Sequence, residues 1–161
     1  MSEPTPSFSS KLAALLAMAE KVLLALAILG LALKVMGQPG DNVLMIALSG
    51  LAGVFFLSGF RPPEVAATEG IKLGFMDMLF STIAPKIAGI GCAVATIGVL
   101  YTLLNMPGSK EMLQVGFAAA TAASALIAVG LAQGNERART LSPFLTRLLP
   151  LLGICTYYLF R

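Results

Sequence analysis

The chain has 161 residues, of which 57% are hydrophobic and only 12% are charged, and its net charge is +3. Its mean hydropathy is +0.87. Soluble globular domains are about 45–50% apolar and about 25% charged, so this chain has too few polar residues to cover a soluble surface. The composition excludes a soluble domain and indicates an integral membrane protein. The sequence also has no histidine, the commonest general base and metal ligand.

Residues 1–9 form a polar tail rich in Pro and Ser, and they precede a first predicted helical hairpin at residues 10–60. The first helix of this hairpin runs to about Met36. The second is an uncharged run from Val43 to Phe60. At 1.5 Å per residue this run is about 27 Å long, close to the thickness of the hydrocarbon core of a bilayer.

A connection over residues 61–82 follows, in which apolar residues recur at helical spacing. This spacing predicts an amphipathic helix that lies in the membrane interface. A second hairpin occupies residues 83–132, and its last segment, Met112 to Ala132, again carries no charge. The sequence therefore predicts an all-α integral membrane protein with four transmembrane helices in two hairpins.

Residues 133–161 combine a basic linker with a final apolar helix. Arg147 and Pro150 interrupt this helix. Small or polar residues recur along it at helical spacing, a pattern that suits packing against other membrane helices. Two interpretations stay open at this point: the helix forms a fifth membrane span, or it lies as an interfacial or re-entrant helix.

The two hairpins share a Pro-Gly turn. Pro39 and Gly40 align with Pro107 and Gly108, an offset of 68 residues. Each unit consists of an apolar helix, the turn and a second apolar helix, and this matched context predicts an internal repeat. Because each unit contains two helices, both copies would have the same orientation, with a pseudo-twofold axis along the membrane normal.

The strings around these turns resemble a known family. ALKVMGQPGDNVLMI looks like the first transmembrane hairpin of the gliding-motility stator subunit L of the type IX secretion motor of Bacteroidota. NMPGSKEMLQVG resembles the turn of related small membrane proteins from the same bacteria. Lys34, Pro39 and Gly40 match the family pattern. The stator subunit carries a membrane glutamate in its second helix, whereas Val43 to Phe60 has no acidic residue and Thr102 replaces Lys34 in the second unit. These departures argue against a proton-conducting role.

Three charged residues are candidates for function because charges in apolar helices are costly. Lys34 either pairs with an acidic residue, of which Asp41 is the nearest, or binds an anion, or extends to the interface from the helix end. Glu20 is a membrane proton acceptor or an interfacial charge beside Lys21, where we expect the first helix to enter the membrane. Arg147 holds a lipid phosphate or a membrane partner, or is a boundary residue that reaches the interface.

Small residues spaced four apart predict close packing between helices. We expect Cys92 and Cys155, which lie in apolar runs, to be buried small hydrophobic residues without a disulfide or metal. The small-residue pairs are Ser49 and Gly53, Gly89 and Ala93, and Gly91 and Ala95.

Most lysines and arginines lie away from the Pro-Gly turns. The positive-inside rule then predicts a cytoplasmic N-terminus and a cytoplasmic connection in a multi-pass protein of the bacterial inner (plasma) membrane. Because the positive-inside rule accounts for the basic residues, we expect no nucleic-acid partner. The expected partners are the lipid bilayer and either another membrane protein or further copies of the chain.

No paired carboxylates and no nucleophile–base pair can be recognised in the sequence, so we expect no enzymatic activity, cofactor or metal. Our first hypothesis is a non-enzymatic structural or assembly subunit. The alternative is a small ion or solute channel or transporter built on the pseudo-twofold repeat.

Overall fold

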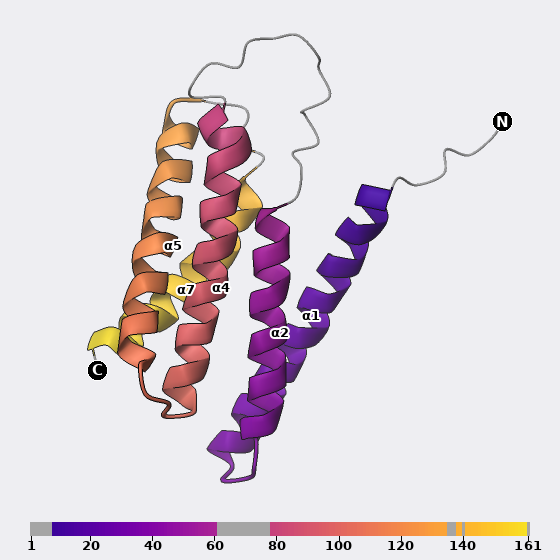
Figure 1. Ribbon diagram of the computed structural model, residues 1–161, viewed down its shortest axis with the longest axis vertical. Coiled ribbons are helices and arrows are strands. Elements are labelled where there is room, and N and C mark those ends of the chain that lie inside the picture. The colour runs from indigo at the N-terminus through magenta and orange to yellow at the C-terminus, as the bar shows by residue number, and fades with distance from the viewer. Residues whose placement is uncertain (1–7, 61–77, 135–137, 140, 161) are drawn as a thin grey trace, which may run out of the picture.

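Figure 1 shows the computed structural model, which describes residues 8–60, 78–134, 138–139 and 141–160. The regular structure of these residues is entirely helical. The helices are α1 (Phe8–Val35), α2 (Asp41–Gly59), the π-helical turn η1 (Leu79–Ile83), α4 (Ala84–Leu103), α5 (Ser109–Ala132) and α7 (Ser142–Phe160).

Four of these helices are long and apolar enough to cross a membrane. The qualifying stretches are Lys11–Val35 in α1 and the whole of α2, α4 and α5, while Phe144–Phe160 in α7 is a shorter apolar helix. The prediction of an all-α membrane protein with four candidate spans and a further C-terminal helix is confirmed.

The helices form a row in which each packs on the next. Helix α1 packs on α2, α2 on α4 and α4 on α5, and α7 crosses one face of α4 and α5 diagonally (Figure 1). The α1–α2 turn and the α4–α5 turn lie at the same end of the molecule (Figure 1). Helix α7 begins nearer the opposite end and runs towards the turn end, where it ends beside the α4–α5 turn (Figure 1).

The two turns share the hydrogen bonds that end their first helices. Gly37 and Asn105 terminate the first helix of each hairpin with φ angles of 75° and 53°, in the left-handed region. A bond from Gln38 N to Leu33 O at 2.9 Å closes the first turn. Its counterpart in the second turn, from Met106 N to Tyr101 O, measures 2.8 Å. Helices α1 and α4 therefore both end in a Schellman motif.

The second hairpin is held together by glycines that meet backbone. A Cβ on Gly98 would lie 2.9 Å from Leu113 Cα, and a Cβ on Gly116 would overlap the backbone of Ala95. On its other side α4 meets α2, where a Cβ on Gly89 would lie 2.6 Å from Gly59 Cα. Small residues let membrane helices approach this closely, as the spacing predicted for α4.

The predicted packing role of Ser49 and Gly53 within the chain is wrong. Both residues are exposed, and a Cβ on Gly53 would meet no atom within 4 Å. Helix α2 instead buries its opposite face, which carries Leu44, Leu48 and Phe55. Periodicity alone did not identify which face of α2 points towards its neighbours.

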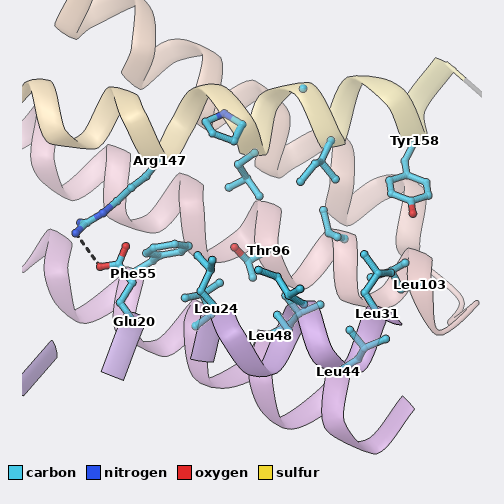
Figure 2. Close-up of a pocket in the computed structure, with 18 of the residues that line it drawn as sticks. Glu20, Leu24, Leu31, Leu44, Leu48, Phe55, Thr96, Leu103, Arg147 and Tyr158 are labelled. Carbon is cyan, nitrogen blue, oxygen red and sulfur yellow. Dashed lines mark ion pairs between the residues drawn. The ribbon is translucent and has the colours of Figure 1, made fainter. Parts of the chain in front are cut away.

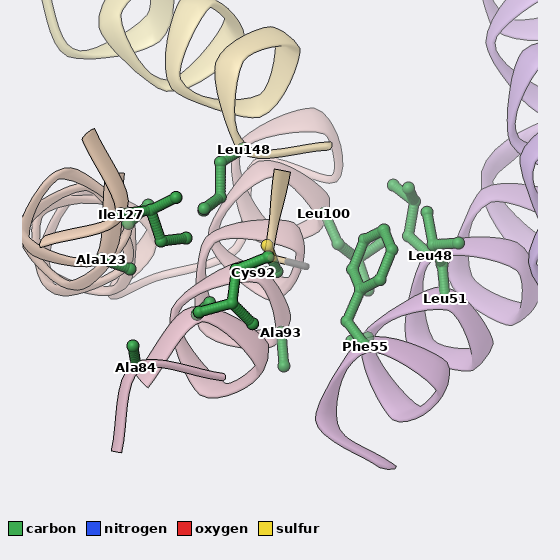
Figure 3. Packing of buried hydrophobic residues seen from close by; sticks show 14 of the residues in the cluster. Leu48, Leu51, Phe55, Ala84, Cys92, Ala93, Leu100, Ala123, Ile127 and Leu148 are labelled. Carbon is green, nitrogen blue, oxygen red and sulfur yellow. The ribbon is translucent and has the colours of Figure 1, made fainter. Parts of the chain in front are cut away.

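The core lies where α2, α5 and α7 meet α4 (Figure 3). Leu48 and Phe55 of α2 approach α4 from one side, and Ile127 of α5 and Leu148 of α7 approach it from the other. Cys92 lies among them in α4 and is 1% exposed, and Cys155 in α7 is fully buried. The predicted burial of both cysteines is therefore confirmed.

The described boundaries differ slightly from those predicted. Helix α1 begins at Phe8, inside the tail predicted for residues 1–9. The amphipathic helix predicted within residues 61–82 lies mostly outside the described residues. Where the chain is described again, η1 leads directly into α4, with Pro85 in the first turn. Because proline has no N–H, the first turn of a helix is where it costs least.

Candidate functional site

Lys34 joins the two hairpins. It lies in the last turn of α1, and its Nζ is 2.6 Å from Oδ1 of Asp41, the first residue of α2. The same Nζ donates a hydrogen bond of 2.6 Å to the carbonyl oxygen of Leu103, the last residue of α4. The C-terminal carbonyls of a helix lack intrahelical partners and carry its partial negative charge, so a lysine stabilises them. The structure thus gives Lys34 the acidic partner considered above and adds a contact between hairpins.

Glu20 and Arg147 form an ion pair between α1 and α7. Oε2 of Glu20 lies 2.7 Å from Nη2 of Arg147, and the two side chains are 16% and 31% exposed. The Arg147 guanidinium also lies 5.7 Å from the ring centroid of Phe144. Sequence reasoning treated the two charges separately and missed the pair. The available signal was that each is a lone charge of opposite sign in an apolar helix, where charges usually pair.

The ion pair lies near the start of α7 and the end of α2, whereas Glu20 is 12 residues from the start of α1. Arg147 is in the second turn of α7, and Phe55, which lines the same space, is in the last two turns of α2. At 1.5 Å per residue, both are about 6–8 Å from the nearer end of their helices. Helix α1 has 28 residues, about 42 Å, so it exceeds a hydrocarbon core of about 30 Å. From Lys21 to Val35 the helix is only about 22 Å long, and the stretch that qualifies as a span is Lys11–Val35. Entry of α1 into the membrane near Lys21 stays a prediction.

A groove of about 760 Å³ lies between α1, α2, α4 and α7. Figure 2 shows Glu20 and Arg147 at one end of this groove and Tyr158 at the other, near Leu31 and Leu103. Leu24, Leu44 and Leu48 line the space between the two ends (Figure 2), and most of the remaining lining residues are also apolar, the exceptions being Thr96, Thr146 and Tyr157. The groove therefore has one charged end and a long apolar floor.

Thr96 is a polar residue in the middle of this floor. Its Oγ1 donates a hydrogen bond of 2.7 Å to the carbonyl oxygen of Cys92, one helical turn earlier. Because the hydroxyl hydrogen is used within α4, Thr96 has no donor left for a ligand or ion in the groove.

The four turn residues shape the backbone rather than carry chemistry. Pro39 and Pro107 are exposed at the two tips. Gly40 is buried, and a Cβ there would overlap the carbonyl oxygen of Gly30 in α1. Gly108 has open space around it but a φ of 80°. The two aligned glycines therefore serve different purposes: a close helix approach in the first turn and a left-handed conformation in the second.

Comparisons with protein-family models, curated proteins and solved structures give no match for this chain. Within the described parts of the chain, no group of three or more Asp, Glu, Cys or His residues could hold a metal ion. The chemistry of the site is therefore inferred from its two ion pairs and its apolar groove.

Proposed function

We propose that this chain is a non-enzymatic structural or assembly subunit of the bacterial inner membrane. The observation that carries the proposal is that its candidate functional charges bind one another. Glu20 is paired with Arg147, and Lys34 is paired with Asp41 and with the C-terminus of α4. Ion pairs that join helices from different parts of the chain fix their relative positions, as a scaffold requires.

The lining of the groove argues against the alternative, an ion or solute conductor. A conducting path needs polar or charged groups that replace water along its length. Besides the Glu20–Arg147 pair, the described lining offers only the hydroxyl groups of Thr96, which is bonded within α4, and of Thr146, Tyr157 and Tyr158, which neighbour the two ends of the groove in sequence. This groove offers no continuous series of ligands for a hydrated ion.

The proposal includes an origin by duplication of one hairpin unit. The matched Schellman motifs support it, because Gly37 and Asn105 occupy equivalent positions in the aligned turns. Gly30 and Gly98, also 68 residues apart, each allow the return helix to approach closely. The resemblance to gliding-motility stator hairpins concerns these same turns and suggests that the partner is a larger membrane complex.

We further propose that the N-terminus and the connection between the hairpins face the cytoplasm, with both turns on the opposite side. The distribution of lysine and arginine supports this orientation. Helix α7 would then be a tilted fifth membrane helix that ends on the side of the turns. Its diagonal course across α4 and α5 in Figure 1 supports this placement.

The experiment is extraction of the tagged protein from native membranes in a mild detergent, followed by mass identification of the proteins that come with it. The matched control is the Gly116→Leu variant, whose second hairpin should not pack. We expect a stoichiometric membrane partner with the wild-type chain and its loss with the variant. Recovery of the wild-type chain alone, together with ion or solute flux in liposomes, would overturn the proposal in favour of a conductor.

A further inference from the structure

We propose that the groove between α1 and α7 binds one zwitterionic phospholipid. Its phosphate would lie on Arg147, its headgroup ammonium on Glu20, and one acyl chain along the apolar floor towards Tyr158. This inference goes beyond the subunit role and does not depend on it. It rests on the dimensions of the groove, the charges at its end and its opening towards the membrane.

The dimensions of the groove suit an acyl chain better than a protein segment. From Arg147 to Tyr158 the groove follows about 16 Å of α7. An α-helix of this length, about 10 Å wide with its side chains, would occupy at least roughly 1,200 Å³. The groove holds about 760 Å³, within the range of about 300–1,000 Å³ typical of small-molecule sites.

The charged end matches a phosphate and an ammonium side by side. Arginine has five N–H donors in a planar fork that fits phosphate oxygens. The ion pair engages Nη2 of Arg147, and the side chain remains 31% exposed, so further donors are accessible. The Glu20 carboxylate positions the guanidinium and has acceptor capacity left for an ammonium. The two opposite charges of the ion pair are complementary to the two opposite charges of a zwitterionic headgroup.

The groove opens towards the surface that lipid would cover. Leu24, Ile28 and Ile154 line it, and they are 46%, 63% and 43% exposed. Both α1 and α7 are apolar helices of a membrane protein, so the fluid nearest this opening is bilayer lipid rather than water.

Two glycines provide a matched test. Gly153 lines the groove, and a Cβ there would meet no atom within 4 Å, so Gly153→Leu should fill the groove without displacing a helix. Gly53 has the same open surroundings but does not line the groove, so Gly53→Leu adds the same side chain elsewhere. The two variants separate occupation of the groove from general effects of a larger residue.

The experiment uses the full chain in vesicles of phosphatidylethanolamine and phosphatidylglycerol with a trace of phosphatidylethanolamine that carries a photoreactive acyl chain. After illumination, peptide mass spectrometry maps the labelled residues. We expect labelling concentrated on groove residues such as Leu48 and Ile154. Gly153→Leu should reduce it about tenfold, whereas Gly53→Leu should leave it unchanged.

A second variant tests the headgroup contact while it keeps the net charge of the pair. Glu20→Gln combined with Arg147→Gln should lower groove labelling about tenfold, the size expected for loss of a charge-assisted hydrogen bond. Labelling spread evenly over all exposed apolar residues would overturn the proposal. So would equal labelling in wild type and Gly153→Leu.

Discussion

The second hairpin and the α1 side of the molecule differ in the kind of side chain that they use for packing in a membrane. Between α4 and α5 the contact is made by small residues, among them Ala95, Ala120 and Ala123, which are all at most 1% exposed. Helix α1 instead presents large aliphatic side chains outwards, with Met18 71% and Ile28 63% exposed. Lipid solvates such side chains as well as protein does, so burial of large apolar groups does not drive helices together there.

The comparison teaches that the turn and the packing are separate properties of a hairpin. Both hairpins have the same Schellman termination and the same Pro-Gly sequence at the tip, although Gly40 and Gly108 differ in backbone conformation. They differ in the side chains along their helices, and only the second is closed along its length by glycine and alanine. On the α1 side, Gly30 and Gly40 bring α1 and α2 together only near their turn, and the Glu20–Arg147 ion pair joins α1 to α7 farther from it.

The largest expected effect is loss of the close contact in the second hairpin. Gly116→Leu would place a side chain against the backbone of Ala95, which cannot move without separating α4 from α5. We expect destabilisation of about 3 kcal/mol. The measurement is the temperature at which the monodisperse peak disappears in size-exclusion chromatography in detergent. Gly53→Leu, on the outer face of α2, should match wild type; equal losses for both variants would contradict the assigned contact.

The next largest effect concerns the Glu20–Arg147 ion pair between α1 and α7. Arg147→Gln leaves the 16% exposed Glu20 carboxylate without its cation, which should cost about 2 kcal/mol. Glu20→Gln combined with Arg147→Gln removes both charges and should cost less than Arg147→Gln alone. A double-mutant cycle of thermal stability measures the coupling. Additive effects of the two single changes would show that the charges do not interact.

A smaller effect is expected where Lys34 joins the hairpins. Lys34→Met removes the contacts with Asp41 and with the Leu103 carbonyl, both partly solvated, and should cost about 1 kcal/mol. Lys110→Met, at an exposed position in the first turn of α5, is the control and should change stability little. Thermal unfolding at low and high salt checks both. A wild-type melting temperature for Lys34→Met would show that the contacts of Lys34 with Asp41 and Leu103 do not stabilise the protein.

The smallest effects test the equivalence of the turns. Gly37→Asn gives the first turn the residue that its counterpart, Asn105, already has at φ 53°, so it should cost under about 0.5 kcal/mol. Gly108→Ala, at φ 80°, should cost about 1 kcal/mol because alanine disfavours this conformation. The comparison of their melting temperatures checks the order. A larger loss for Gly37→Asn than for Gly108→Ala would mean that the aligned turns are not equivalent.

The sequence predicted those features that depend on local composition. Uncharged apolar runs gave the candidate spans, and Pro39 and Pro107 marked the two turns, because the hydrocarbon core requires long helices and proline with glycine ends them. The burial of Cys92 and Cys155 followed in the same way from their apolar surroundings.

Relations between distant segments could not be predicted. The partner of Glu20 lies at the other end of the chain, and nothing local to either residue specifies how α7 crosses α4. Ser49 and Gly53 have the same spacing as the glycines that pack, so the pattern did not distinguish an inward from an outward face. The groove depends on all four surrounding helices, and therefore on these same relations.

The central claim is that both hairpins have the same orientation and that α7 runs beside them towards their turns. Single cysteines at Gln38, Met106 and Phe160, all exposed, can be labelled with a membrane-impermeant maleimide in inside-out and right-side-out vesicles. The native Cys92 and Cys155 are buried and should react little. We predict that all three sites react from the same side of the membrane. Labelling of Gln38 and Met106 from opposite sides, or of Phe160 from the side opposite the turns, would contradict the account.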